Sequence, residues 1–104
     1  MDFEHVIMEL IINAGESKGL AMQALSAAKK GEWSSVDDLL IESTEAAKRA
    51  HSVQTQLIGM DEGEGKVPLN LIMVHAQDHI MTAMLARELI DELIDVHRKL
   101  QKLS

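Results

Sequence analysis

Apolar side chains recur every three to four residues along most of the chain, a spacing that predicts α-helices rather than strands. The first helix is expected over about residues 2–30, ending near Gly31, because glycine is common just after a helix. The second is expected over about residues 35–59. Its N-cap would be Ser34 or Ser35, and the acidic residues of its first turn would be Asp37 and Asp38.

The stretch from Met60 to Pro68 reads as a loop, because it combines glycines, a proline and several charges. The third helix is expected to hold Pro68 in its first turn and to run to about Leu103. Short connections make successive helices antiparallel neighbours. The predicted fold class is therefore all-α. We expect residues 1–104 to form a single domain, an up-down-up three-helix bundle with a long third helix.

The third helix carries an apolar arc that should face the core of the bundle, but polar residues interrupt it. The arc consists of Leu71, Ile72, Ala76, Ala83, Ala86, Leu89, Ile90, Leu93 and Leu100. At about 100° per residue, it also contains His75, Asp78, His79 and Thr82. Burying an unpaired polar group costs on the order of 2–7 kcal/mol. Such a cluster is therefore expected to satisfy its own hydrogen bonds, to bind something, or to do chemistry.

The opposite side of the third helix changes character near Leu85. Beyond that residue it is charged, with Arg87, Glu88, Asp91, Glu92, Asp95, Arg98, Lys99 and Lys102. Before it, the same side carries Met73, Ile80, Met81 and Met84, which a lone bundle would expose. We therefore expect other subunits or a docking partner to cover the first half of this helix; a few tolerated exposed methionines are the alternative.

Composition removes several classes of function. A formal net charge of −7 argues against nucleic acid and against an anionic membrane surface. The chain has no cysteine, which excludes disulfides, thiol nucleophiles and thiolate metal sites. The N-terminal residues lack a signal-peptide pattern, and no apolar run approaches the roughly 20 residues of a membrane span. A soluble cytoplasmic protein is expected.

The run His75-Ala76-Gln77-Asp78-His79 allows three interpretations. Imidazoles four residues apart on a helix, with a carboxylate between them, can bind a metal ion, although the HExxH signature is absent. Alternatively, one histidine attacks phosphorus and becomes a phosphohistidine, while His79 and Gln77 help to bind the phosphoryl oxygens. The third interpretation is a set of core polar groups that satisfy one another.

The segment Leu71–Thr82 resembles the signature of the lactose/cellobiose class of IIA components of the bacterial sugar phosphotransferase system. The resemblance extends over essentially the whole chain, including Ile11–Gly15, the turn Gly31-Glu32-Trp33 and Ala50–Ile58. Within the class, Met84–Ile90 resembles the cellobiose/chitobiose branch more than the lactose branch.

The resemblance implies a specific activity. Members of this class are three-helix bundles that form trimers and relay phosphate from the carrier HPr to a cysteine of a IIB component. On that analogy His75 is the phosphorylated nucleophile, with His79 and Gln77 beside the phosphoryl group. Asp78 matches the position at which three subunits share Mg²⁺ or another divalent cation on the trimer axis.

Other functions stay open on sequence alone. One is a histidine-containing phosphotransfer module of two-component signalling, although such modules generally have four helices. Another is a non-enzymatic metal-binding or interaction bundle that uses the cluster of His75, Asp78 and His79.

Lys18 lies on the apolar stripe of its helix but too far along it for the phosphoryl site, whereas His51 and Gln54 are near the right level. For the side chains of His51 and Gln54 we favour ordinary packing or exposure to solvent.

Overall fold

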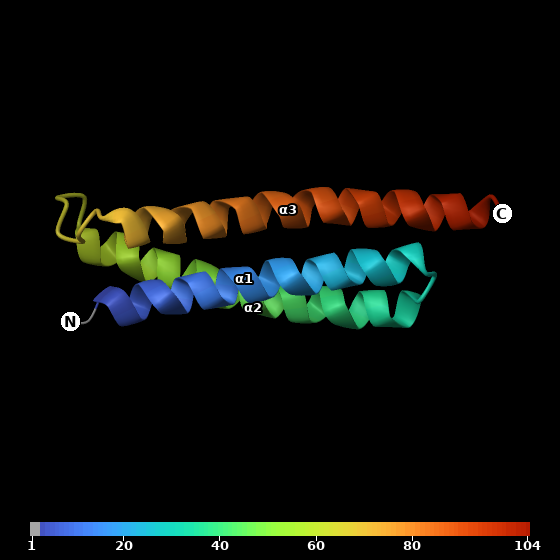
Figure 1. The fold of residues 1–104 in the computed structure, drawn as a ribbon, viewed down its shortest axis with the longest axis horizontal. Helices are drawn as coiled ribbons and strands as arrows, with labels where there is room; N and C mark the ends of the chain where they lie inside the picture. Colours follow the sequence, from blue (N-terminus) through green and yellow to red (C-terminus); the bar gives the residue numbers. More distant parts are fainter. Residues whose placement is uncertain (1–2) are drawn as a thin grey trace.

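The structure is a computed structural model that describes residues 3–104 as three α-helices. They are α1 (Phe3–Lys29), α2 (Trp33–Asp61) and α3 (Leu71–Lys102), joined by a turn at 30–32 and a loop at 62–70. They lie side by side in a rod of 56 × 19 × 17 Å, and α3 extends beyond the turn between α1 and α2 (Figure 1). The predicted all-α, up-down-up bundle with a long third helix is confirmed.

The predicted start of α3 is wrong. The helix begins at Leu71 rather than with Pro68, which lies in the preceding loop. Asn70 is the N-cap, and its Oδ1 accepts a hydrogen bond of 3.0 Å from the backbone N–H of Met73. A side-chain cap satisfies an N–H that has no partner within the helix, so it fixes the first turn at this point.

The predicted start of α2 is also wrong. This helix begins at Trp33, one residue before the earlier of the two predicted serine caps. Its N-cap is Glu32, which makes no side-chain cap hydrogen bond, and the first turn contains no acidic residue. Trp33 packs against the apolar cluster at this end of the bundle, so tertiary packing rather than a serine cap sets the start of the helix.

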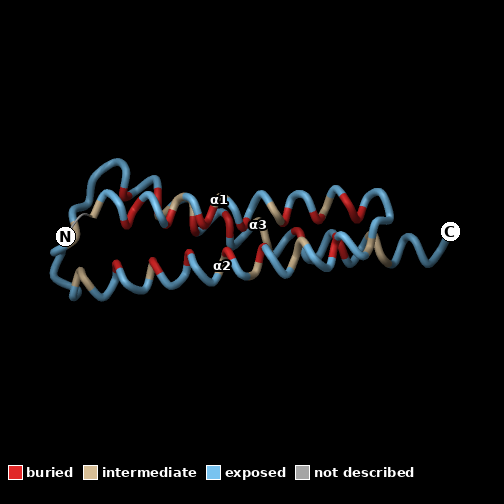
Figure 2. The backbone as a smooth tube through the Cα atoms, turned by 90° about the horizontal axis from the view of Figure 1, so that it is seen from below, coloured by how far each residue is buried: buried red, intermediate tan, exposed pale blue. Residues whose placement is uncertain are grey.

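Small side chains line the interior of the bundle, which lets the helices approach closely. Buried positions follow the facing sides of the three helices (Figure 2). One apolar cluster includes Leu10, Ala14, Ala50, Ala76 and Ile80, and lies at the end that holds the 62–70 loop. A second, rich in alanine, lies towards the other end. Ser17 and Ser43 are buried, and each hydroxyl donates to the other's backbone carbonyl, at 2.9 and 2.8 Å.

The predicted inner face of α3 is only partly right. Ala76, Ala83 and Ile90 are buried as predicted, but Leu71, Leu89, Leu93 and Leu100 are exposed, and so are His75, Asp78 and Thr82. Met73 and Ile80, predicted to face outward, are buried, at 5% and 3% exposure. The helix has apolar residues on two sides, and the side with the small alanines is the one that fits against its own chain.

The exposed side of α3 has a regular spacing. Its positions alternate between steps of four and three residues: Leu71, His75, Asp78, Thr82, Leu85, Leu89, Glu92 and Val96 are all exposed. We call this set the outer seam. A 3–4 alternation of this kind is the pattern of a helix that packs against another helix in a coiled coil.

None of the helices within residues 3–104 is both long and apolar enough to span a membrane.

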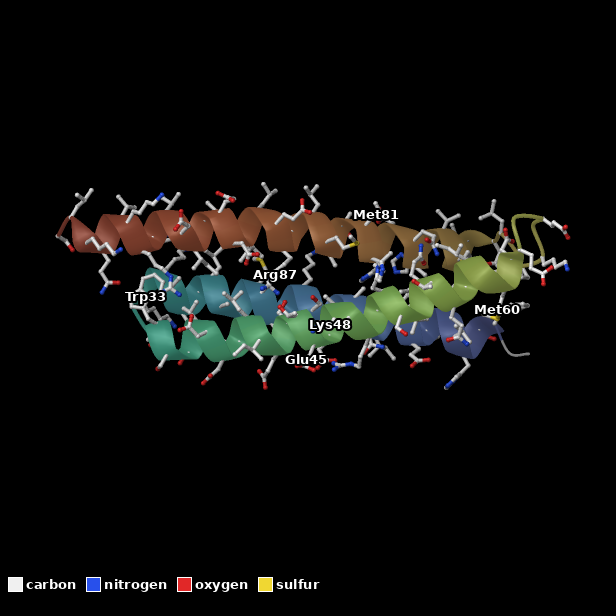
Figure 3. The ribbon with its side chains drawn as sticks, turned by 180° about the vertical axis from the view of Figure 1, so that it is seen from behind. Trp33, Glu45, Lys48, Met60, Met81 and Arg87 are labelled. Carbon is white, nitrogen blue, oxygen red and sulfur yellow. The ribbon has the colours of Figure 1, made fainter. Side chains whose placement is uncertain are left out.

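α3 packs chiefly against α1 and approaches α2 mainly through polar side chains. Arg87 reaches from α3 towards α2 (Figure 3), where it donates hydrogen bonds to the hydroxyls of Ser43 (3.0 Å) and Thr44 (3.1 Å). Its predicted place on a solvated outer arc is therefore wrong, and its side chain is only 21% exposed. Further along, the Arg98 guanidinium lies 4.5 Å from the centroid of the Trp33 ring. A groove of about 570 Å³ runs between α2 and α3.

Candidate functional site

His75 and His79 form a pair on the first half of α3. They lie one helical turn apart, their ring centroids are 4.8 Å apart, and the planes meet at 71° in an edge-to-face contact. His75 is exposed and His79 is half-buried. The arrangement therefore presents one accessible imidazole with a second imidazole behind it, as the phosphohistidine interpretation requires.

The half-buried ring of His79 lies next to a glycine of the neighbouring helix. A Cβ placed on Gly15 of α1 would lie 4.0 Å from Cε1 of His79. The His79 ring therefore lies against the backbone of α1, and this backing limits the positions that the ring can adopt. The contact also couples the His75–His79 pair to the bundle rather than to α3 alone.

Asp78 lies on the outer seam, away from the core. Within residues 3–104 its carboxylate makes no hydrogen bond and no ion pair, whereas Thr82 donates to its backbone carbonyl at 2.7 Å. The same part of the chain holds no group of three or more His, Asp or Glu side chains that could bind a metal ion. The geometry therefore gives no support to a metal site built from His75, Asp78 and His79 of one chain.

Gln77 lies on a different side of α3 from His75. Two residues apart on a helix means about 200° of rotation, so the two side chains project in nearly opposite directions. Gln77 faces α2, where its Oε1 accepts a hydrogen bond of 2.6 Å from Nε2 of Gln54. The structure therefore brings His75 and His79 together but does not bring Gln77 to the His75 of the same chain.

Gln54 is the residue whose position the sequence did not identify. Its side chain is half-buried and packs against α3 through a hydrogen bond to Gln77, a partner that the sequence does not indicate. The sequence does contain a hint of this position. Gln54 is a long amide side chain that lies in α2 between Val53 and Leu57, and both of these residues are buried in the core. The side chains of His51 and Lys18 are exposed.

The chain matches the family described as the lactose/cellobiose-specific IIA subunit of the PTS system over residues 5–98. It is 51% identical over 100 residues to the PTS system N,N'-diacetylchitobiose-specific EIIA component of Escherichia coli K12, covering 96% of this chain and 86% of that protein.

Solved structures of IIA proteins have the same fold. The crystal structure of the PTS cellobiose-specific enzyme IIA from Bacillus anthracis superposes with a TM-score of 0.95, at 35% identity, covering 100% of this chain and 95% of that one. The IIA(Chitobiose) protein in the solution structures of the IIA(Chitobiose)–HPr complex of Escherichia coli gives 0.83 at 50% identity, covering 97% and 98%.

Proposed function

Because this chain belongs to the family of lactose/cellobiose-specific IIA subunits of the phosphotransferase system, we propose that His75 accepts a phosphoryl group from phosphorylated HPr. His75 then passes the group to a cysteine of a IIB component during uptake of a disaccharide of the cellobiose/chitobiose class. The observation that carries the proposal is the exposed His75 ring with His79 4.8 Å behind it. A relative that is 50% identical forms a complex with HPr.

The transfer needs little beyond positioning, because it exchanges one phosphoryl carrier for another. The lone pair of a neutral His75 nitrogen attacks phosphorus in line and forms an N–P bond. The donor's N–P bond breaks at the same time, and its electron pair returns to the donor imidazole. In the second transfer the IIB thiolate attacks phosphorus, and the bonding pair returns to His75. We expect His79 to bind a phosphoryl oxygen in both steps, because its ring lies next to the ring of His75.

We propose that three copies of the chain assemble through the outer seam. The seam holds Leu71, Leu85, Leu89 and Val96, each at least half exposed in the single chain. Apolar residues at heptad spacing along a helix are buried when parallel copies pack together. The apolar side chains that remain exposed on α3 therefore support an assembly, and the family resemblance supplies the number three.

The assembly also gives Gln77 a place in the site. In a parallel bundle of three α3 helices that meet along the outer seam, one flank of the seam faces the other flank of the neighbouring helix, and His75 lies on one flank. Gln77 lies towards the other flank, at about the same level along the helix. We therefore place Gln77 beside the His75 of a neighbouring subunit, so that the phosphoryl site is completed between two copies.

Asp78 is the proposed ligand of a shared divalent cation. Its carboxylate is exposed on the seam and makes no hydrogen bond or ion pair within residues 3–104, so three symmetric copies would face one another. Carboxylate oxygens suit Mg²⁺, whose charge would offset their repulsion. The Asp78→Leu variant should lose bound metal, measured by elemental analysis, and remain trimeric. Metal retained in that variant would contradict the assignment.

The proposed function is tested by intact mass after incubation with phosphoenolpyruvate, enzyme I and HPr, with and without acid quenching. One acid-labile phosphoryl group per chain is expected, and His75→Ala should lose it while keeping its helical circular dichroism. His97→Ala, which changes a histidine at the other end of α3, is the matched control and should still be labelled. Labelling that persists in His75→Ala would contradict the proposal, and so would tight zinc binding without phosphorylation.

A further inference from the structure

The contact between Gln54 and Gln77 crosses from α2 to α3 where these two helices otherwise approach little. The Nε2 group of Gln54 donates to Oε1 of Gln77 at 2.6 Å, and the contact is partly buried. Side-chain amides can adopt two orientations that exchange a donor for an acceptor. In the structure Gln54 is the donor, so the oxygen of the Gln77 amide faces α2 and its NH₂ group points away from Gln54.

The two ends of the Gln77 amide have unequal partners. Its oxygen is held by Gln54, whereas its NH₂ group donates to the sulfur of Met73 at 3.4 Å. A thioether sulfur is a weak acceptor, so the NH₂ group gives up little when a stronger acceptor arrives. Phosphoryl oxygens are strong charged acceptors and require a donor. With Gln54 as the donor, the end of the Gln77 amide that stays available is its NH₂ group.

Gln54 itself is poorly satisfied. Its Oε1 is buried and has no hydrogen-bond partner, and it is the only such side-chain atom within residues 3–104. A buried acceptor without a partner is unfavourable for folding. An apolar side chain of similar length would avoid this loss, so stability alone does not explain a glutamine at this position.

We propose that Gln54 is a positioning residue that fixes the Gln77 amide with its NH₂ group directed to the phosphoryl group on His75 of the neighbouring subunit. This inference rests on the proposed function and extends its site to α2. Gln54 does not contact the phosphoryl group, and its whole effect passes through Gln77. Its removal should therefore slow phosphoryl transfer without weakening the fold.

The first test replaces Gln54 by methionine, which has a similar length and cannot donate. We expect the maximal rate of phosphoryl acceptance from phosphorylated HPr to fall about tenfold, because a hydrogen bond to a charged group is lost or misdirected. The HPr concentration at half-maximal rate should change little. The melting temperature should stay the same or rise, because the unpartnered Oε1 is gone. Gln56→Met, on the exposed surface of α2, is the matched control and should leave the rate unchanged.

The second test asks whether the effect passes through Gln77. Gln54→Glu places an acceptor against Gln77, which should turn the amide and present its oxygen to the phosphoryl group, so the rate should fall further than in Gln54→Met. In a Gln77→Met background, both Gln54 variants should have no additional effect. Gln56→Glu controls for the added charge.

The outcomes separate the inference from the proposed function. If unaltered protein is phosphorylated on His75 but Gln54→Met transfers at the normal rate, the inference is wrong and the function stands. A Gln54→Met variant that is slow only because it melts at lower temperature would also contradict the inference. So would a Gln54→Met substitution that slows transfer as much in the Gln77→Met background as in the unaltered protein. If the unaltered protein accepts no phosphoryl group, the proposed function itself is wrong.

Discussion

The two sides of α3 are both apolar, yet only one of them is buried by its own chain. The inner side presents Ala76 and Ala83 between Met73, Ile80 and Ile90, and all of these are at most 5% exposed. The outer seam has larger residues, and its Leu85 and Leu89 are each 56% exposed. Alanine lets α1 approach closely, whereas leucine at heptad spacing fits another copy of the same helix. His75 and Asp78, the proposed phosphoryl acceptor and metal ligand, lie where the seam becomes polar.

The largest effect is expected from charging the outer seam. Leu85→Glu combined with Leu89→Glu would bury unpaired carboxylates in the assembly, at a cost of at least about 4 kcal/mol, or about a thousandfold in association. Sedimentation should change from three times the chain mass to the single 11.5 kDa chain, with helicity retained. Ile41→Glu, at a residue of α2 that is 61% exposed, is the control and should leave the assembly intact.

The opposite outcome for this pair would be informative. If the doubly substituted protein still sediments as a trimer, the seam is not the interface. If it unfolds instead, the outer side of α3 contributes to the fold of the single chain, and the distinction between the two sides fails.

A truncation on the inner side should reduce stability. Ile80→Ala removes a side chain that is 3% exposed and packs in the apolar cluster beside the histidines, so the free energy of unfolding should fall by about 2–5 kcal/mol. Urea denaturation measures the change. Ile58→Ala makes the same substitution at a residue that is 64% exposed, and a loss of stability there as large as at Ile80 would contradict the assigned burial.

The smallest effect concerns the junction between the histidine pair and the bundle. Gly15→Ala should raise the free energy of unfolding by about 0.5–1 kcal/mol, because glycine is unfavourable inside a helix. The added Cβ would meet His79 at 4.0 Å, an ordinary contact, so the rate of phosphorylation should not change. Gly19→Ala, which has nothing within 4 Å, should stabilise equally. A slow Gly15→Ala variant with a normal fold would show that His79 needs more room.

The number and order of the helices could be predicted from sequence, because a spacing of three to four residues persists through each of them. The faces of α3 could not, because apolar residues on both sides leave two ways to orient the helix. The sequence predicts that His75 lies in a polar cluster, and its ring does contact that of His79. The predicted burial of His75 is wrong, because the side of α3 that carries it is not the side that packs against the chain's own core. Helix starts failed at Pro68 and at the serines near Trp33, where a side-chain cap in one case and tertiary packing in the other decided the boundary.

The partner of Gln77 shows a different limit. A helical projection places Gln77 away from His75, but it does not indicate which residue of α2 faces it, because that depends on how the two helices pack. The contact with Gln54 emerges only when α2 and α3 are both in place. Similarly, a heptad spacing in one chain predicts that a partner exists and says nothing about how many copies assemble.

The central claim is that each phosphoryl site is built from His75 of one subunit and Gln77 of the next. It is tested most directly by mixing His75→Ala subunits with Gln77→Met subunits through unfolding and refolding, then following phosphorylation by intact mass. His75→Ala subunits accept nothing, and Gln77→Met subunits alone should be slow. When equal amounts are mixed, about half of all the Gln77→Met subunits should regain the fast rate, because they lie beside an unaltered Gln77 of a His75→Ala subunit. If every Gln77→Met subunit stays slow after mixing, the site is not shared between subunits and the account is wrong.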